Sequence, residues 1–289
     1  MTLLDPAFAR ELEALRRRMQ VRARSGGGGD HIAKRRGGSA EFLEHRPYTA
    51  GEDLRRMDWL AFARTGEPIL KLFRAEEDVV VRLLLDESAS LDAGEPSKMD
   101  AAKRLAAAIG YMAAAGSERA QVLAAGIGLS RVSEPMRGRA ALPKLLRELD
   151  RIAPRGGTDL TRAIDDVVQR SGRPGMLVVV SDFLDPGPFD QAIGRAALAG
   201  HDLALVQILS AEELEPTYDG DVAFEDAETG AVVEVTLHAS ALAAYIERLN
   251  GLILGLRALS KRHRATYVRA STKEPTIDVV RRFVSRAVD

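Results

Sequence analysis

Hydrophobic positions form two kinds of pattern that alternate along most of the chain. Short runs that are almost entirely apolar, such as 79–85 and 176–180, are typical of strands buried on both faces of a parallel sheet. Longer segments, such as 97–115 and 159–170, carry apolar residues every three or four positions, which indicates amphipathic helices. This alternation predicts an α/β fold with a mostly parallel sheet and helices on both of its faces.

The same two patterns predict the remaining elements of this domain. We expect further strands at 121–125, 129–133, 203–209 and 266–269, and further helices at 142–152, 189–199, 239–261 and 277–288. The short strand 129–133 is expected at an edge of the sheet. Apolar residues at 222–224 and 232–237 flank a turn that ends in glycine, 226–230, and this predicts an inserted β-hairpin at about 220–238.

The N-terminal part of the chain follows a different pattern. Residues 6–24 are predicted to form a charged amphipathic helix, which is followed by a run of four glycines that indicates a flexible connector. Segment 41–78 is polar, aromatic and irregular, and we expect Trp59 to help pack it against the core, with a direct contact to a partner as the alternative. The predicted organisation is therefore a helix and linker (1–40), this docking segment, and the α/β domain (79–289).

Composition excludes several kinds of chemistry. Hydrophobic residues make up 46% of the chain and charged residues 29%, as in ordinary globular proteins, and there is no cysteine. Disulfides, thiolate nucleophiles and cysteine zinc sites are therefore excluded. The longest apolar stretch, 242–259, is interrupted by Glu247 and other polar residues, so no membrane span is expected. With no basic segment preceding an apolar run at the start, we expect a cytoplasmic location.

Charge is distributed unevenly along the chain. Residues 75–260 carry 18 lysines and arginines against 29 aspartates and glutamates, whereas the two flanks are basic and the total net charge is −1. An acidic centre suits a cation site and argues against a groove for nucleic acid. The basic clusters at the ends are short, so we expect them to be solvated faces or surfaces that contact the acidic centre, and nucleic-acid binding is not expected.

Candidate chemistry lies where two buried strands end. Asp86 follows the first strand and leads into Ser88 and Ser90, Asp182 follows the strand at 176–180, and Thr158 opens a helix between them. In open α/β sheets, ligands bind beyond the carboxyl ends of the strands. Two carboxylates and three hydroxyls form an all-oxygen set, which suits a hard cation such as Mg²⁺ or Mn²⁺.

The other acidic residues near these positions are not expected to bind metal. Aspartate and serine commonly start turns and cap helices, so the Asp-x-Ser-x-Ser spacing alone would be a weak signal. We expect Glu87 and Asp159 to be exposed or to cap helices, and Asp92 and Asp185 to be turn residues.

The order and spacing of the candidate ligands resemble a known site. Asp-x-Ser-x-Ser after a buried strand, threonine in Gly-Gly-Thr-Asp, and aspartate after a later buried strand are similar to the metal-ion-dependent adhesion site (MIDAS) of von Willebrand A domains. All five positions are matched, by Asp86, Ser88, Ser90, Thr158 and Asp182. The resemblance implies a von Willebrand A-like doubly wound sheet, metal ligation that is direct or nearly direct by the three hydroxyls, and aspartates that act largely through water.

A narrower resemblance covers residues from about 40 to the end. It rests on Arg46-x-Tyr48-x-x-Gly51-Glu52-Asp53-x-Arg55-x-x-Asp58-Trp59, then Ala63-Arg64, then Lys71-x-Phe73-x-x-Glu76, and later Phe224-Glu225-Asp226-Ala227-Glu228-Thr229-Gly230. These motifs are similar to those of the bacterial proteins called domain-of-unknown-function family 58. Members of that family are often encoded near MoxR-type AAA+ ATPases, which implies such an ATPase as a partner.

Three function classes are compatible with these features. The favoured one is a protein-binding module, an adaptor in which a partner's Asp or Glu completes the coordination of the metal. The alternative is a Mg²⁺-dependent, phosphatase-like hydrolase that uses Asp86 and Asp182, although Ser88 stands where a haloacid-dehalogenase-like enzyme needs its second aspartate. The third is a purely structural subunit.

Two observations would distinguish the binding module from the enzyme. A strongly raised carboxylate pKa in a cleft would favour the hydrolase. An open metal face without a deep pocket would favour the binding module, and we expect no enzymatic activity.

Overall fold

The computed structural model describes most of the chain, in two compact units. The described residues are 3–25, 42–49, 52–54, 57–73, 79–116, 118–185, 187–216, 220–225, 227 and 230–288. One unit comprises residues 1–26 and 79–289, and the other comprises residues 27–78. The predicted glycine connector and most of the predicted hairpin turn lie outside the described residues.

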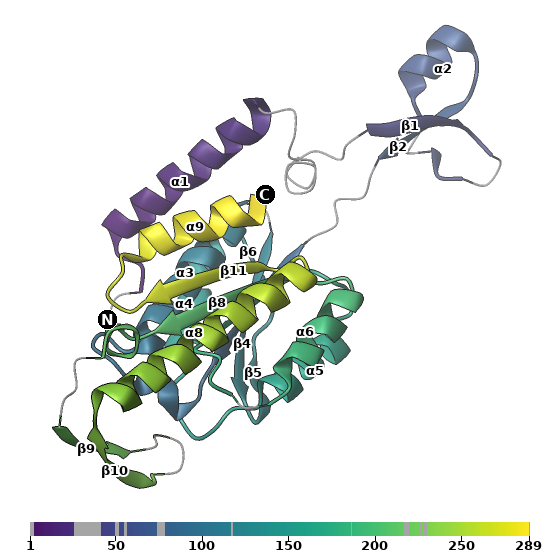
Figure 1. Cartoon of the computed structure of the whole chain (residues 1–289). Coiled ribbons are helices and arrows are strands. Elements are labelled where there is room, and N and C mark those ends of the chain that lie inside the picture. Colours follow the sequence, from purple (N-terminus) through teal and green to yellow (C-terminus); the bar gives the residue numbers. More distant parts are fainter. Residues whose placement is uncertain are drawn as a thin grey trace. The chain divides into compact units, whose positions relative to one another are not determined.

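The larger unit is built on a mostly parallel sheet (Figure 1). In spatial order its strands are β11 (Thr266–Ser271), β8 (Asp202–Leu209), β7 (Met176–Ser181), β3 (Val80–Asp86), β4 (Arg119–Gly126) and β5 (Gly128–Val132), and β6 (Met136–Arg137) also pairs with β4. The five strands from β11 to β4 are parallel, whereas β5 and β6 run antiparallel to β4. Strand β5 ends this order, as its short apolar run predicted.

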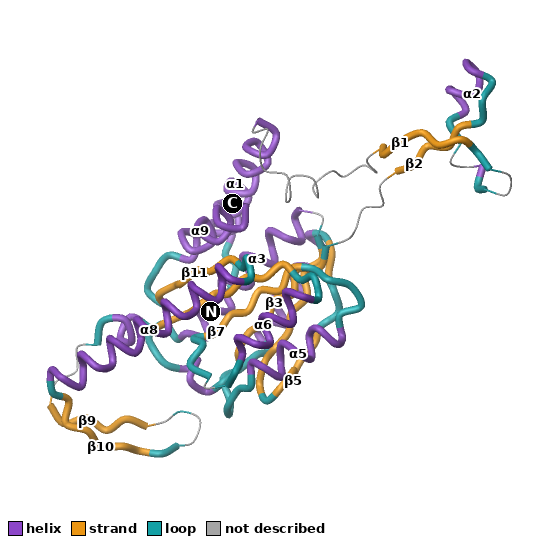
Figure 2. Tube along the Cα trace, turned by 45° about the vertical axis from the view of Figure 1, so that its right-hand side comes forward, coloured by secondary structure: helices purple, strands orange, loops and turns teal. Residues whose placement is uncertain are grey.

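Helices cover both faces of this sheet (Figures 1 and 2). One face is covered by α1 (Pro6–Ser25), α3 (Lys98–Gly116), α4 (Leu142–Asp150) and α9 (Thr276–Val288). The other face is covered by α5 (Leu160–Arg170), α6 (Phe189–Leu198) and α8 (Ala239–Arg262). The predicted α/β, von Willebrand A-like architecture, a doubly wound sheet between two helical layers, is confirmed.

Strand β3 shows how the sequence produces the two layers of core. Leu83 and Leu85 point into the cluster formed with α3 and α4, whereas Leu84 points into the cluster formed with α5 and α6, and all three are fully buried. Each such leucine contributes roughly 2 kcal/mol by leaving water. An almost continuous apolar run is therefore what a central parallel strand requires, and it ends at Asp86 on the carboxyl edge.

Short elements complete this unit. They are the 3-10 turns η3 (Ala89–Asp92) and η4 (Arg139–Ala141), the one-turn helix α7 (Ala211–Leu214), and the strands β9 (Gly220–Glu225) and β10 (Val232–Leu237). The last two pair antiparallel and form the predicted hairpin. Among the helices that the structure describes, none is long and apolar enough to cross a membrane.

The smaller unit has regular structure that the sequence pattern did not predict. Strands β1 (Phe42–Pro47) and β2 (Ile69–Phe73) pair antiparallel, and the helix α2 (Trp59–Thr65) lies between them in the sequence. The carboxylate of Asp58 caps α2 by accepting from the Ala61 amide. The expectation that segment 41–78 is irregular is wrong, because a short capped helix and a single strand pair are too brief to produce a periodic pattern. Its docking against the larger unit stays a prediction.

Candidate metal centre

The topology places two carboxylates at one edge of the sheet. Strands β3 and β7 are parallel neighbours in which Leu85 pairs with Val180, so Asp86 and Asp182 both follow at the carboxyl edge. Their side chains are almost completely buried, at 1% and 2% exposed. A buried carboxylate needs hydrogen bonds or a cation to offset the loss of hydration, and both are found here.

A chain of hydrogen bonds joins four of the five predicted ligands. The Ser88 amide donates to Asp86 Oδ1 at 2.9 Å, and the Ser88 and Ser90 hydroxyls lie 3.0 Å apart. The Ser90 hydroxyl then donates to Asp182 Oδ2 at 2.9 Å. The carboxylate and hydroxyl oxygens therefore converge, although they come from two strand ends and from the turn η3.

The loop that carries the fifth predicted ligand lies against the loop that carries the serines. The Arg155 amide donates to the Glu87 carbonyl at 2.7 Å, and the Ala89 amide donates to the Gly156 carbonyl at 2.8 Å. Gly156 has a φ of +55°, a conformation that glycine adopts without the strain that a side chain would cause. These two bonds hold the start of α5 beside the turn η3.

Thr158 is placed close to this edge but is not part of the hydrogen-bonded chain. Its half-buried hydroxyl makes only long contacts, 3.5 Å each, with the carbonyl oxygens of Ala125 and Gly126 at the end of β4. Contacts of this length hold a hydroxyl weakly, so the group can turn. The structure thus brings four predicted ligands into contact and leaves the fifth on the adjoining loop.

Glu87 differs from its prediction. The sequence suggested an exposed or capping residue, yet Glu87 is only 3% exposed and its carboxylate accepts from the Arg155 guanidinium at 3.0 Å. The reason is that the Glu87 amide bonds to the Ala125 carbonyl and extends the β3–β4 ladder by one residue. The side chain is therefore directed into the structure instead of into solvent.

The remaining acidic residues behave as local sequence predicted. Asp159 caps α5 by accepting from the Arg162 amide, and Asp92 is exposed at the end of η3. Asp185 is a turn residue, whose carboxylate accepts from the Gly187 amide and also from the Leu160 amide at 2.8 Å. This last bond ties the loop after β7 to the start of α5.

The environment of Asp86 favours its protonated form. The pKa of Asp86 is raised to about 6, first by burial and then by the neighbouring carboxylate of Asp182, against the lowering effect of hydrogen bonds from Ser181 and Ser88. The Ser181 hydroxyl donates to Asp86 Oδ2 at 2.6 Å. A divalent cation beside Asp86 would counter both causes of the raised pKa.

Sequence reasoning missed a lysine that contacts the site. Lys98 is the first residue of α3 and is only 1% exposed, and its ammonium lies 2.7 Å from Asp182 Oδ2 and 2.7 Å from Glu213 Oε1. Burial lowers the pKa of Lys98, but the carboxylates of Asp182 and Glu213 outweigh this effect and leave the pKa raised. Lys98 is therefore a buried cation held between two anions.

The sequence contained one local signal for this lysine. Acidic residues are preferred in the first turn of a helix and basic ones in the last, because of the helix dipole. Lys98 stands at the unfavourable end, next to the predicted capping residue Ser97, whose hydroxyl does accept from the Asp100 amide. Its partner Glu213 could not have been found from the sequence, since it lies in the one-turn helix α7, 115 residues away.

The backbone beyond Asp182 has an uncommon conformation. Phe183 has a φ of +59°, a backbone conformation that residues other than glycine, asparagine and aspartate rarely adopt. The Phe183 amide donates to the Ser181 hydroxyl, and the Leu184 amide donates to Asp182 Oδ1 at 3.1 Å. The Gln207 side chain adds a bond to the Asp182 carbonyl. These contacts fix the direction of the Asp182 carboxylate.

The donor set fits a hard divalent cation. Carboxylate, hydroxyl and water oxygens are the ligands that Mg²⁺ and Mn²⁺ prefer, and the two aspartates and two serines supply four such side chains. Among the described residues, no three His, Cys, Asp or Glu side chains gather into a metal cluster, so any such site depends on its hydroxyls. The hydroxyls of Ser88 and Ser90 would then turn their lone pairs toward the cation.

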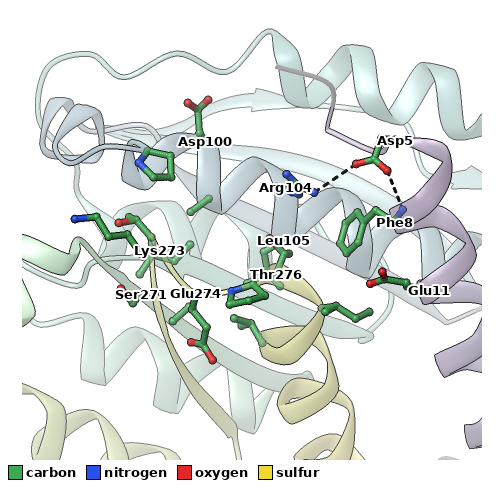
Figure 3. A pocket seen from close by; sticks show the side chains of 18 of the residues that line it. Asp5, Phe8, Glu11, Asp100, Arg104, Leu105, Ser271, Lys273, Glu274 and Thr276 are labelled. Carbon is green, nitrogen blue, oxygen red and sulfur yellow. Dashed lines mark hydrogen bonds and ion pairs between the residues drawn. The ribbon is translucent and has the colours of Figure 1, made fainter.

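A cavity of about 370 Å³ lies elsewhere in the same unit (Figure 3). Residues of α1, α3, β8, β11 and α9 line it, and none of the five predicted ligands is among them. Inside it, Arg104 points toward Asp5, and its guanidinium lies over the Phe8 ring, 5.0 Å from the ring centroid. This cavity is thus separate from the polar edge described above.

Comparison with known proteins reveals several relatives. The chain is 35% identical over 240 residues to uncharacterized proteins of Mycobacterium tuberculosis and Mycobacterium bovis, covering 81% of this chain and 75% of theirs. A conserved hypothetical protein BatB from Bacteroides thetaiotaomicron has a similar crystal structure, with a TM-score of 0.48 and 19% identity over 72% of this chain and 98% of that one.

A second solved structure is similar over a shorter stretch. The manganese-loaded TRAP protein of Plasmodium vivax matches with a TM-score of 0.34 and 18% identity, over 45% of this chain and 57% of that one. The family model described as "Protein of unknown function DUF58" matches residues 44–250, which is most of the chain. The chain therefore belongs to the DUF58 family.

Proposed function

We propose that this protein is a metal-dependent protein-binding module whose carboxyl edge holds one Mg²⁺ or Mn²⁺ ion. The observation that carries the proposal is the hydrogen-bonded chain from Asp86 through Ser88 and Ser90 to Asp182. It gathers oxygen donors from two strand ends and one turn. Thr158, on the adjoining loop, would complete the protein's share of the ligands by turning its weakly held hydroxyl toward the ion.

A ligand set rich in neutral hydroxyls favours binding an anionic partner. The three hydroxyl ligands compensate none of the ion's positive charge, and Lys98 already neutralises part of the charge on Asp182. A carboxylate from an Asp or Glu of another protein is therefore an appropriate last ligand. Such a bridge is reversible, since it forms when the metal is present and is lost on chelation.

The partner that we propose is a MoxR-type AAA+ ATPase or a client that it acts on. The support is the resemblance of segment 46–76 to family members often encoded near such ATPases, and the chain itself contains no ATP-binding motif. An adaptor that grips a protein through a metal-bridged carboxylate would suit an ATPase that remodels other proteins.

A Mg²⁺-dependent hydrolase is the second candidate, and one observation favours it. The pKa of Asp86 is raised to about 6 by burial and by Asp182, which suits an acid or base that works near neutral pH. The binding module remains the better explanation. Burial beside a second carboxylate accounts for the raised pKa without any catalytic role, and the 370 Å³ cavity is lined by residues other than the predicted ligands.

The decisive experiment is thermal denaturation with and without metal. Mg²⁺ or Mn²⁺ at about 100 times its dissociation constant should stabilise the wild type by about 2.7 kcal/mol, because it binds the folded state alone. Asp86→Asn keeps the shape of the side chain but removes its charge, and it should abolish the increase in melting temperature. Thr158→Val should abolish or strongly reduce the increase.

Asp92→Asn is the matched control. Asp92 is an exposed aspartate of the same turn, η3, and it has no role in the proposed site. This variant should respond to metal like the wild type. A full response in the Asp86→Asn protein would refute the metal site.

The partner is tested with purified components. A MoxR-type ATPase from the same genome should bind the wild type in Mn²⁺ more tightly than in EDTA, and Ser88→Ala should lose that difference. Equal binding in all conditions would show that the metal edge does not contact the ATPase. Hydrolase activity that depends on Asp86, in a panel of phosphate esters with Mg²⁺, would instead establish the second candidate.

A further inference from the structure

Lys98 places a buried positive charge directly against Asp182, one of the proposed metal ligands. Its ammonium lies 2.7 Å from Asp182 Oδ2, and the same oxygen accepts from the Ser90 hydroxyl. Asp182 Oδ2 therefore already binds one cation from within the chain. A metal ion that is bound by the Asp182 carboxylate would therefore compete with Lys98 for it.

The second anion that Lys98 contacts is held rigidly. Glu213 Oε1 accepts from Lys98, and Glu213 Oε2 accepts from the Ser210 amide as half of the capping box of α7. The Glu213 carbonyl also accepts from the Tyr245 hydroxyl of α8. Glu213 is thus a fixed alternative partner for the ammonium.

The loop before α3 is shaped so that Lys98 reaches both anions. Gly94 has a φ of +91°, and a side chain there would place its Cβ 2.8 Å from the Cβ of Ser210. The absence of that side chain lets the loop approach the turn between β8 and α7. The Lys98 amide is in turn anchored to the Ala93 carbonyl at 3.0 Å.

We propose that Lys98 is a built-in competitor of the divalent metal, shared between Asp182 of the metal edge and Glu213 of α7, and that this sharing sets the metal affinity. The inference rests on the proposed metal site. When the ion binds, the Asp182 carboxylate interacts with it and less strongly with Lys98. The Lys98 ammonium is then neutralised mainly by Glu213. Occupancy of the edge is therefore linked to α7 and, through the bond from the Tyr245 hydroxyl to the Glu213 carbonyl, to α8.

The proposal predicts opposite effects of two substitutions. Lys98→Met removes the competing cation and leaves Asp182 and Glu213 without a counter-charge, so the metal should bind about tenfold more tightly or better. Glu213→Gln removes the alternative partner, so Lys98 should pair fully with Asp182 and metal should bind several-fold more weakly. A lysine that served only to hold the fold together would weaken binding in both variants or leave it unchanged.

Glu212→Gln is the matched control. Glu212 is the neighbouring carboxylate of the same one-turn helix, but it pairs with Lys273 at 2.8 Å and not with Lys98. It loses the same charge as Glu213→Gln, so any difference between the two reflects the contact with Lys98. Its metal affinity should stay within about twofold of the wild type.

The experiment is calorimetric titration of the four metal-free, full-length proteins with MnCl₂ and MgCl₂, together with urea denaturation of each without metal. Tighter binding by Lys98→Met, despite its lower stability, and weaker binding by Glu213→Gln would support the proposal. Equal affinities in wild type and Glu213→Gln would overturn it, and this comparison decides even if Lys98→Met does not fold. No binding by the wild type would overturn the proposed metal site as well.

Discussion

The carboxyl edge of the larger unit and helix α2 of the smaller unit depart from usual burial in opposite ways. At the edge, charged side chains are enclosed, with Lys98 at 1% and Asp86 at 1% exposed. On α2, large apolar side chains are left uncovered by the rest of the smaller unit, with Trp59 at 58% and Leu60 at 73% exposed. Both are unusual, since charged residues are rarely fully buried and contiguous exposed apolar surface often marks a contact site.

The difference indicates what each region is suited to bind. Buried charges are stable only with counter-charges and hydrogen bonds, which suits the edge to the small ion and the anionic group that we propose there. Covering exposed aromatic and aliphatic side chains removes apolar area from water and lowers the free energy, so α2 is suited to contact the surface of another protein. Residues of both regions belong to the DUF58 match, which spans 44–250.

The largest expected effect is on the pH dependence of the edge. A proton competes with metal for Asp86, whose pKa is raised to about 6, so metal should bind about tenfold more weakly for each pH unit below 6. Calorimetric titrations at pH 7, 6 and 5 measure this. An affinity that is constant from pH 7 to 5 would contradict the role of Asp86.

The same group has a separate effect on the metal-free protein, with a definite sign. Its pKa in the folded state, about 6, lies above its ordinary value of 3.8, so between these values the folded state binds more protons than the unfolded state. The free energy of unfolding due to this group should therefore fall as pH rises from about 4 to about 6. Urea denaturation across that range should show the decrease, and Asp86→Asn should remove it.

A smaller effect is expected where the edge meets the loop before α5. Arg155→Ala leaves the buried Glu87 carboxylate without its guanidinium, and the free energy of unfolding should fall by about 1–3 kcal/mol. Arg151→Ala removes an exposed pair with Glu148 within one helical turn, and should cost no more than about 0.5 kcal/mol. If urea denaturation gave the same loss of unfolding free energy for Arg155→Ala and Arg151→Ala, the guanidinium of Arg155 would not be needed to stabilise the buried Glu87 carboxylate.

The smallest effect on stability is expected in α2. Leu60→Ser changes a side chain that is 73% exposed, so the free energy of unfolding should stay within about 0.5 kcal/mol of the wild type. The response to metal should also be unchanged, whereas binding of the proposed ATPase should weaken if α2 contributes to that contact. A large loss of stability would show instead that Leu60 is covered, as the predicted docking of segment 41–78 requires.

Local sequence was sufficient for the layered domain and for much of its edge. The apolar run that ends at Asp86 predicts a central parallel strand, because such a strand is buried on both faces and allows no polar alternation. The placement of Asp86 and Asp182 together followed from the rule that parallel strands end at one edge. The capping role of Asp159 was predictable too, since it depends on a residue three positions away.

Contacts between distant segments needed the tertiary structure. Segment 41–78 contains a strand pair whose partners are 22 to 31 residues apart, and neither strand is long enough to show a period of two. Glu87 became buried because its amide extends the sheet ladder, which depends on the register between β3 and β4.

Lys98 is the clearest case of this division. By itself the sequence determined a lysine at the start of a helix, where the dipole disfavours it. Only the tertiary structure decided that its ammonium is enclosed between Asp182 and Glu213, 84 and 115 residues away. Hydrophobic periodicity predicts which face of a segment packs against the core. An ion pair between distant residues depends instead on which strand ends and turns lie side by side in the folded chain, and no local sequence pattern predicts this.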